Sequence, residues 1–527
     1  MANSANLPAP YQGVNEKIPA AGLKSPNCET LLNFNTNQAG ISLRKGDAKY
    51  STFTRAISDP LGLYPYGDTK LFAAVYRSFG AGIDFTDAET GTVEFTTGNQ
   101  LSITAVNSLF FNNYLFFFFN TATFAPGYHW NGAAMAATTY TGNVANFWPI
   151  GGNVYNKRAY LIQLNEPAYW YTPLSAITGV CTKVSLGEFL QQKATLSAIA
   201  SFTLSENATI QYVQAFIFSN GEILFYTGSY PDSADWTLLG SAKIGQPLFA
   251  QSVIPYQGDT LIMCDSGVVS LRDLFQRGSQ KAIGLSVNSL IQRSWRALVQ
   301  DMRRLLNRPN GPITGGYLVG NVRGVYDPKS DRIIISFPYY LQSNGAATNG
   351  SYYFIFDNQL EAWYHGRSFG GIVYDIAAYK NKVLLLGKSL VSSTYMVWEK
   401  EGSTGYMDRR NDDASDVGYD YTMTSAPIPF PKTAVYETTG IEPIIQSDLY
   451  TETNWTLISD FGKQTTNNQN ISDTMGTSIT KPLVNAGIQN ITYVQVAMNG
   501  TTVAGKTVGL DLYSYNVWYN SGDIGSR

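Results

Sequence analysis

A short apolar run that begins directly after a polar turn recurs about seven times along the chain, at intervals of roughly 40 to 60 residues. Aromatic-rich stretches such as Tyr169–Tyr171 and Tyr395–Trp398 follow most of these runs. Each unit therefore predicts one antiparallel meander, and this period is typical of the blades of a β-propeller. The runs are Leu71–Tyr76, Tyr114–Phe119, Ala159–Ile162, Ile223–Tyr226, Leu261–Met263, Ile333–Ile335 and Val383–Leu386.

The composition supports a mainly β fold. Charged residues make up 14% of the 527 positions, against about 25% in typical soluble domains, while 44% are hydrophobic and 13% aromatic. Coiled coils, helical solenoids and disordered chains need more charge or more Ala, Glu, Lys and Leu, so these classes are excluded. A pair of β-sandwiches remains the alternative to a propeller, because it would show the same strands without a regular period.

Two segments have a helical rather than a β pattern. In residues 286–308, Leu290, Trp295 and Met302 belong to an apolar stripe with a 3.6-residue period, while Arg296 and Arg303 lie on the other side. This pattern predicts an amphipathic helix of about six turns, inserted between the fifth and sixth units. A looser spacing over residues 185–202 predicts a second helix.

Composition shifts divide the rest of the chain. Residues 1–45 are rich in proline at their start and predict an extended N-terminal arm, and residues 46–400 predict the propeller-like domain. Residues 401–433, which are acidic and then punctuated by proline, predict a linker or irregular arm. Alternating stretches over residues 434–527 predict a C-terminal antiparallel β domain.

Few residues are of the kinds that metal sites and catalytic sites need. His129 and His365 each stand beside aromatic residues and have no second ligand at metal-binding spacing, so we interpret both as packed or hydrogen-bonded. Cys28, Cys181 and Cys264 lie far apart and predict reduced, buried thiols. The usual hydrolase, kinase and dinucleotide motifs do not occur. We therefore predict no catalytic, cofactor-binding or metal-binding residue and no enzyme.

Three further features need an interpretation. Ser229–Trp236 resembles the Asp-box turn of sialidases but lacks its glycine, and a propeller could place a carboxylate pair for sugar cleavage. The acidic loop 408–420 is interpreted as solvated, with a weak Ca²⁺ site as the alternative. Leu115–Phe119 is too short to span a bilayer and predicts a strand buried on both faces.

The charge distribution bears on binding partners. The net charge is −3, so the whole molecule lacks the positive excess of a protein that coats DNA. Residues 281–308, however, hold six basic residues against Asp301. This asymmetry is compatible with a solvated helix face, a subunit contact or contact with DNA phosphates. Candidates for a subunit-interface or DNA-facing role are Arg293, Trp295, Arg296, Arg303 and Arg304.

Several stretches, in this order, carry a resemblance to a known family. They are Ala215–Gly228, Leu248–Ser252, Asp259–Met263, Val325–Pro328 before Ile333–Ile335, Tyr353–Asp357 with Glu361–Trp363, and Val508–Tyr513. In these stretches the chain resembles the packaged-DNA stabilisation proteins, or tail nozzle proteins, of short-tailed (podovirus-type) bacteriophages. The resemblance covers most of residues 200–400 and the order of the C-terminal region, and it rests on strand patterns rather than on a catalytic signature.

The resemblance implies a propeller platform in a six-fold ring that extends the tail channel, retains the packaged genome and lets it pass at ejection. Implied partners are further copies of the chain, the tail adaptor (head-to-tail connector) protein, tail needle or tip and tail fibre or tailspike proteins, and double-stranded DNA without sequence preference. The implied location is the virion, after synthesis in the host cytoplasm. No segment predicts a membrane span. The alternative function is a glycan-binding or glycan-cleaving propeller.

Overall fold

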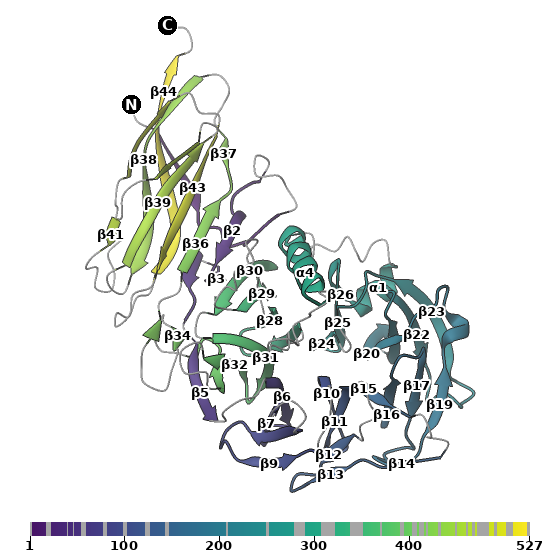
Figure 1. The fold of residues 1–527 in the computed structure, drawn as a ribbon. Coiled ribbons are helices and arrows are strands. Elements are labelled where there is room, and N and C mark those ends of the chain that lie inside the picture. Colours follow the sequence, from purple (N-terminus) through teal and green to yellow (C-terminus); the bar gives the residue numbers. More distant parts are fainter. Residues whose placement is uncertain are drawn as a thin grey trace.

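The structure is a computed structural model of the chain (Figure 1). It describes residues 3–16, 23–38, 40–45, 47–53, 60–76, 82–98, 103–121, 127–142, 147–206, 209–248, 252–278, 290–306, 322–337, 351–368, 371–389, 395–402, 408–409, 416–417, 420–429, 434–447, 451–459, 462–465, 469–471, 484–489, 493–501 and 510–523. Strands dominate this part of the chain, which confirms the mainly β prediction.

Seven blades of three or four strands, counted within the described residues, form a β-propeller, and the strands of blade 6 belong to a larger sheet. Blade 1 consists of β6 (Pro60–Tyr66), β7 (Lys70–Tyr76), β8 (Ile83–Asp87) and β9 (Val93–Thr96), and blade 2 of β10 (Ile103–Phe111), β11 (Tyr114–Thr121), β12 (Tyr128–Trp130) and β13 (Met135–Ala137). Blade 3 consists of β15 (Pro149–Tyr155), β16 (Arg158–Gln163), β17 (Ala168–Tyr171) and β19 (Thr182–Ser185). Blade 4 consists of β20 (Leu196–Glu206), β21 (Thr209–Phe218), β22 (Glu222–Thr227) and β23 (Thr237–Lys243). The short β14 (Tyr140–Thr141) and β18 (Gly179–Val180) pair with each other.

Blades 5 to 7 complete the circle in Figure 1. Blade 5 consists of β24 (Val253–Tyr256), β25 (Asp259–Cys264) and β26 (Gly267–Ser270). Blade 6 consists of β27 (Arg323–Asp327), β28 (Arg332–Phe337), β29 (Ser351–Asp357) and β30 (Ala362–Ser368). Blade 7 consists of β31 (Gly371–Tyr379), β32 (Lys382–Ser389) and β33 (Tyr395–Glu399) together with β5 (Ala48–Phe53). Contacts between neighbouring blades run from β6 through β10, β15 and β20 to blade 5, then through β27 and β31 back to β6. The β-propeller prediction is thereby confirmed.

The apolar runs are the inner parts of the blades, where a strand has a neighbouring blade on each face. In β11, Leu115 and Phe117 pack towards blade 1, whereas Phe116 and Phe118 pack towards blade 3, and all four are buried. Full burial of one such side chain contributes about 1.5–3 kcal/mol. The prediction that Leu115–Phe119 is a strand buried on both faces is confirmed.

The polar turns before these runs have a conformational reason. Asn112 and Asn113 both have positive φ, +51° and +63°, and Lys380 and Asn381 repeat this at +49° and +56°. Two consecutive residues with positive φ define the tight hairpin turn whose twist matches that of its strands, and asparagine tolerates this backbone region best after glycine. These turns set the register of β10 with β11 and of β31 with β32.

A strand from the beginning of the chain closes the propeller. β5 pairs antiparallel with β33 as the outer strand of blade 7, with Phe53 opposite Tyr395. Blade 7 thus joins residues 48–53 to residues 371–399, and this pairing holds the ends of the circle together.

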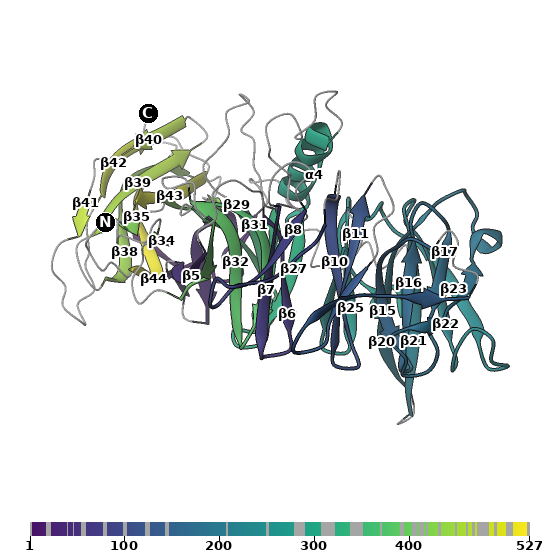
Figure 2. The same cartoon turned by 60° about the horizontal axis from the view of Figure 1, so that its bottom comes forward.

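Among the described residues, two α-helices belong to the propeller part of the chain. The helix α1 (Leu271–Arg277) follows blade 5, and Leu271 and Leu274 pack between blades 4 and 5. The helix α4 (Gln292–Leu306) stands on one side of the disc, as Figure 2 shows, with its apolar face on blades 5 and 6. The predicted helix over residues 286–308 is therefore present, and its outer residues 286–289 and 307–308 lie outside the described part.

The predicted helix over residues 185–202 is wrong. This segment instead holds the end of β19, a single 3-10 turn at Gly187–Phe189 (η2) and the beginning of β20. Ala198 and Ala200 pack towards blade 5 while Ile199 packs towards blade 3. This two-residue alternation, with both faces buried, produced an apolar pattern dense enough to imitate a helix.

The second part of the molecule is a two-layered β-sandwich beside the propeller (Figure 1). One layer has β1 (Asn3–Pro8), β3 (Phe34–Asn37), β4 (Gly40–Leu43), β38 (Ala434–Ser447), β42 (Val484–Gln489) and β44 (Leu510–Asp523). The other has β2 (Cys28–Leu32), β36 (Asp420–Ser425), β37 (Ile428–Pro429), β39 (Thr451–Ser459), β40 (Gly462–Thr465), β41 (Gln469–Ile471) and β43 (Tyr493–Thr501). The small hairpin β34 (Asp408–Arg409) and β35 (Asp416–Val417) lies between the two parts in sequence.

The N-terminal residues form strands of this sandwich rather than an extended arm. β1 and β4 pair with one edge of β44, and β2 pairs with β36. Residues 420–425, placed in the predicted linker, form β36 in the middle of the second layer. Sheet edges carry unpaired backbone N–H and C=O groups, which the N-terminal strands satisfy here.

Sandwich and propeller share one core. Leu31, Phe34 and Trp455 of the sandwich belong to the same buried cluster as Tyr364 of blade 6 and Leu385 of blade 7. In addition, β2 lies parallel to β30 through the pair Leu32 and His365, so the sheet of blade 6 continues into the sandwich. These contacts make the two parts one packed body.

Candidate functional site

The apolar face of the amphipathic helix α4 packs within the chain. Trp295 is fully buried, and its indole Nε1 donates to the carbonyl oxygen of Cys264 at 2.9 Å. Leu298 and Met302 are buried in the same cluster against blades 5 and 6. Trp295 is therefore a core residue of the chain rather than a surface residue that faces a partner or DNA.

The N-terminal segment caps α4. The Glu16 carboxylate accepts a hydrogen bond from the backbone N–H of Ser294 at 2.8 Å and another from its hydroxyl. The backbone N–H of Glu16 in turn donates to the carbonyl oxygen of Leu290 at 2.7 Å. A carboxylate at this end of a helix satisfies free N–H groups and complements the helix dipole.

The basic face of α4 is partly available. Arg293 and Arg296 are exposed. Arg303 is paired, because its guanidinium lies 3.5 Å from Asp265 Oδ2 and 3.3 Å from Gln246 Oε1. Arg304 belongs to α4, and its side chain lies outside the described part. Arg293 and Arg296 are thus the candidate residues that the structure leaves free to meet a partner or DNA.

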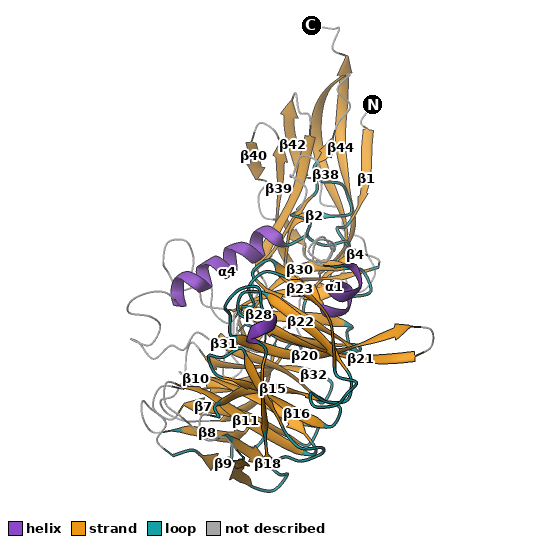
Figure 3. Cartoon of the chain, turned by 90° about the vertical axis from the view of Figure 1, so that its right-hand side faces the viewer, coloured by secondary structure: helices purple, strands orange, loops and turns teal. Residues whose placement is uncertain are grey.

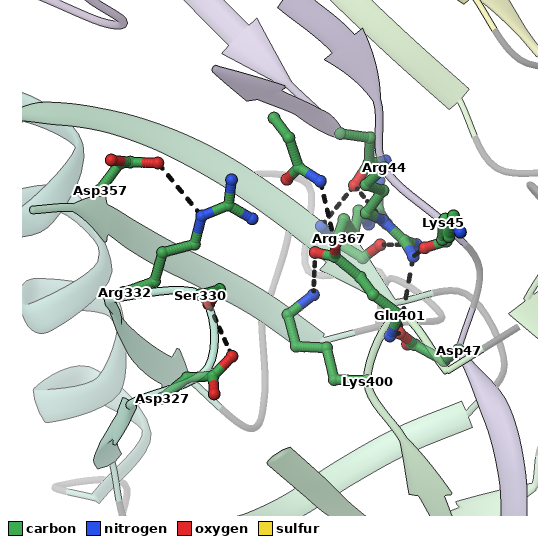
Figure 4. Close-up of polar contacts among 12 residues, drawn as sticks. Arg44, Lys45, Asp47, Asp327, Ser330, Arg332, Asp357, Arg367, Lys400 and Glu401 are labelled. Carbon is green, nitrogen blue, oxygen red and sulfur yellow. Dashed lines mark hydrogen bonds and ion pairs between the residues drawn. The ribbon is translucent and has the colours of Figure 1, made fainter. Parts of the chain in front are cut away.

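A buried ionic cluster joins the sandwich to the propeller (Figure 4). Arg44 follows β4 and is 1% exposed, and its guanidinium donates to Asn33 Oδ1 at 3.0 Å and to the Arg367 carbonyl oxygen at 2.8 Å. Asp47 Oδ1 lies 3.6 Å from the same guanidinium and accepts the backbone N–H of Glu401 at 3.1 Å. These hydrogen bonds and the ion pair with Asp47 offset the cost of burying the Arg44 charge away from water.

Glu401 holds the other half of this cluster. Burial by itself raises the pKa of Glu401, but the charges of Lys400 and Arg332 and a hydrogen bond from Asn35 lower that pKa below its ordinary value. Asn35 donates to Glu401 Oε2 at 2.9 Å, and Lys400 Nζ lies 3.4 Å from Oε1. The Glu401 carboxylate is therefore ionised at neutral pH, and the ionic cluster holds the sandwich and the propeller together. Sequence reasoning missed it, because its members are distant in the chain.

The axis of the propeller holds a cavity of about 540 Å³. The inner strands of several blades line this cavity, and Arg323 of β27 is the basic residue among the lining side chains. The Arg323 guanidinium lies 3.3 Å from the buried carboxylate of Asp375 in β31, whose pKa is raised by burial. Asp375 also accepts the backbone N–H of Leu63 in blade 1 at 2.8 Å. This pair ties three blades together, which is a structural role.

The histidines and cysteines have the predicted structural roles. His365 is buried, its Nδ1 pairs with the Tyr352 hydroxyl, and burial lowers its pKa to about 4. His129 Nδ1 lies 3.0 Å from Thr138 Oγ1. Cys28, Cys181 and Cys264 are free and buried, and burial raises the pKa of the Cys181 thiol to about 12. These predictions are confirmed.

The remaining sequence features fall as follows. The segment Ser229–Trp236 is a compact turn, in which Asp235 Oδ2 accepts the Ser229 hydroxyl at 2.7 Å. Most of the acidic loop 408–420 lies outside the described residues. Within the part that the structure describes, no group of three or more His, Cys, Asp or Glu residues is placed to bind a metal ion. No helix in that part has the length and apolar character needed to cross a membrane.

The fold places the chain among proteins that contain a β-propeller. No family model matches the sequence, and no curated protein matches it. Among solved structures, Chaetomium thermophilum Raptor matches with 10% identity and a TM-score of 0.37 over 68% of this chain, which spans 29% of the length of Raptor. The WD40 propeller domain of Doa1 matches with 9% identity and a TM-score of 0.34, over 67% of this chain and 97% of that domain. A Bacillus subtilis family 43 arabinoxylan arabinofuranohydrolase matches with 11% identity and a TM-score of 0.26, over 80% and 96% of the two chains.

Proposed function

We propose that the protein is a structural subunit of a short bacteriophage tail, which forms a ring of the nozzle or packaged-DNA stabilisation class. The sequence resemblance described above suggests the class, and the distribution of exposed apolar side chains supports assembly. In this role the ring extends the tail channel, helps to retain the packaged genome and passes it at ejection. The protein acts without catalysis.

Exposed large apolar side chains gather on one flank of the molecule. Of the eight such residues in the described part, all except Phe110 lie in blades 3 and 4 or in the segments that join and border them. These two blades lie on the far side of the propeller from the sandwich (Figure 1). We call six of these residues the apolar flank, namely Leu174, Val180, Phe189, Ile210, Leu238 and Leu239; the seventh, Tyr212, also lines the axial cavity. Clustered apolar exposure of this kind is typical of surfaces that bind other proteins.

The shape of the blade 4 hairpin adds to this argument. β20 and β21 continue beyond the body of the propeller, and Figure 3 shows their tip projecting from it. Ile210 is 63% exposed and Tyr212 55% exposed on this hairpin. A projecting hairpin with apolar side chains gains stability when it packs on another surface.

A closed ring needs two different, complementary flanks on each subunit. The apolar flank is one, and the side that carries the sandwich and α4 is the other in our proposal. Arg293 and Arg296 then contribute to subunit contact or face the DNA in the channel. The net charge of −3 suits a channel that conducts DNA without holding it tightly. The adaptor, the tail tip proteins and the fibres or tailspikes are the further proposed partners.

Electron microscopy of phage particles from the source lysate, labelled with gold-conjugated antibody against the purified chain, tests the proposal. Label at a single vertex of each capsid is the expected result, and averaging of that tail gives the symmetry. Label absent from particles would overturn the proposal. Release of reducing ends from host cell-surface polysaccharide by the purified protein would support the glycan-cleaving alternative instead.

Assembly in solution tests the surfaces separately. We expect Leu238→Asp to reduce ring formation, measured by mass photometry, whereas Phe110→Asp, at a more exposed apolar residue outside the flank, should not. Charge reversal at Arg296 tests the helix. If Arg296→Glu leaves assembly intact, α4 is not a subunit contact.

A further inference from the structure

The outer edge of blade 4 differs from the outer edges of the other blades. Its last strand, β23, is seven residues long, whereas the last strands of blades 1, 2 and 3 have three or four residues. Within the described residues, other parts of the chain lie against the remaining outer strands: α1 and α4 contact β26, β2 pairs with β30, and β34 contacts β5. Short or covered edges protect a sheet against pairing with another chain, so β23 is the exception.

The register of β23 shows which of its main-chain groups face outwards. The N–H of Ile244, directly after β23, donates to the carbonyl oxygen of Gly221 at 2.9 Å. Lys243 is paired with Glu222 one step earlier, and the ladder is regular over residues 240–243. Because hydrogen-bonded and non-hydrogen-bonded pairs alternate in an antiparallel ladder, the N–H and C=O groups of Ser241 and Lys243 point away from β22. Among the described residues, these groups have no hydrogen-bond partner.

The side chains of β23 also favour contact with another strand. Leu238 is 38% exposed and Leu239 37% exposed, and both belong to the apolar flank. The strand contains no proline, and its one charged residue, Lys243, stands at its end. Proline and charged side chains are the means by which edge strands resist pairing. β23 therefore combines an open edge with exposed apolar side chains, as in sheets that accept an added strand.

A second copy of the chain carries sheet edges on its opposite side. In the described part, β42 ends one layer of the sandwich and β40 ends the other. Figure 1 shows the sandwich on one side of the molecule and β23 at the far rim of the propeller. A head-to-tail ring brings opposite sides of neighbouring copies together, so the open edge of one copy meets the sandwich of the next.

We propose that the outer edge of β23 pairs through main-chain hydrogen bonds with an edge strand of the sandwich of a neighbouring copy. This inference rests on the proposed ring assembly and names the contact that holds it. The sheet of blade 4 then continues from one copy into the next. The chain already joins its own parts in this way, since β5 is added to β33 in blade 7.

Hydrogen exchange of the full chain, in monomers and in assembled rings separated by size-exclusion chromatography, tests the inference. We expect the amides of Ser241 and Lys243 to exchange on the order of tenfold more slowly in the ring, because a hydrogen-bonded amide must open before it exchanges. Peptides from β40 or β42 should gain protection as well, whereas β9, the outer strand of blade 1, should not change.

The outcomes separate this contact from the proposed function. A ring in which β23 exchanges as fast as in the monomer would overturn the inference and leave the tail role standing. A purified chain that does not assemble would also overturn it, and the gold-labelling experiment would then decide the tail role independently.

A matched pair of variants isolates the main-chain contact. Ser241→Pro removes the outward N–H and keeps the pairs with β22, since proline is tolerated on the open side of an edge strand. We expect it to weaken ring assembly on the order of tenfold in mass photometry, an effect of about 1.4 kcal/mol. Ser241→Ala keeps the N–H and should assemble like the unmodified chain. Thermal unfolding by circular dichroism checks that both variants are folded, and a folded Ser241→Pro protein that assembles normally would refute the contact.

Discussion

The propeller and the sandwich are both β structures, but the chain builds them in opposite ways. Each blade from 1 to 6 comes from one continuous stretch of sequence, and its strands pair with their neighbours in the chain. The sandwich combines residues 3–43 with residues 420–523, so its strands meet across almost the whole chain. Local pairing is entropically inexpensive, whereas the sandwich must close a very long loop before its contacts form.

Blade 7 and the ionic cluster combine local contacts with contacts between residues that are distant in the chain. Blade 7 takes three strands from residues 371–399 and a fourth, β5, from residues 48–53. The cluster around Arg44 and Glu401 lies where the chain passes from one part to the other. The difference between the two parts is therefore testable by variants that remove one kind of contact at a time.

Deletion of residues 1–45 should have the largest effect. It removes the strands that pair with β36 and β44, together with the buried side chains of Leu31, Phe34 and Ile41. At about 1.5–3 kcal/mol for each buried side chain, the loss approaches the stability of a typical domain. We expect hydrogen exchange to lose protection in β39 and β43 while β16 and β22 stay protected. Equal protection in both parts would contradict this dependence.

Arg44→Met should have the next largest effect on the free energy of unfolding. It leaves the Asp47 carboxylate buried without its cation, and such a loss costs about 3–5 kcal/mol. The matched control is Lys380→Met, which breaks the exposed pair with Glu89 and should cost less than about 1 kcal/mol. Denaturant unfolding compares the two. A similar small cost for both would show that the cluster does not hold the parts together.

Glu401→Gln should have an effect that depends on pH. Because the folded-state pKa of Glu401 is lowered, its carboxylate stabilises the protein above the ordinary value of 4.5, and this contribution is lost as the pH falls through the folded-state pKa. The variant should thus be less stable than the unmodified chain at pH 7, by about 1–3 kcal/mol, and the difference should shrink in acid. Unfolding curves at several pH values measure it, with Glu188→Gln at an exposed position as the control. A stability difference that stays constant with pH would show that the ionised Glu401 carboxylate does not stabilise the cluster.

Glu16→Ala should have the smallest effect of the four. It removes the cap of α4 and should cost about 0.5–2 kcal/mol. Hydrogen exchange should rise in the first turn of α4 and remain unchanged in α1, which has its own cap from Ser270. Unchanged exchange in α4 would indicate that the N-terminal segment is not needed there.

The parts that the sequence predicts well are those with local causes. The turn pair Asn112 and Asn113 followed by Leu115–Phe119 contains both the reason for the hairpin and the sign of a strand between two blades. The sequence also predicted the apolar face of α4, although the pattern alone did not show that Trp295 packs in the core of the same chain.

Contacts between distant residues were not predictable in this way. Nothing around Phe34 or Ile41 indicates that their partners lie near residues 421 and 512, because an edge strand is chosen by the sheet that it completes. The apolar flank and the axial cavity lined by Arg323 depend on how the blades are placed side by side, which no local spacing encodes.

The position of β1 beside β44 also sets the order of events during synthesis. The ribosome delivers residues 3–8 first, and their pairing partners at residues 514–519 come more than one propeller later. A chain that stops before β44 has a finished circle of blades but open sheet edges and an exposed half of the sandwich core. The sandwich can therefore close only after β44 has been synthesised, because β44 covers the edges and the part of the core that the earlier strands leave open.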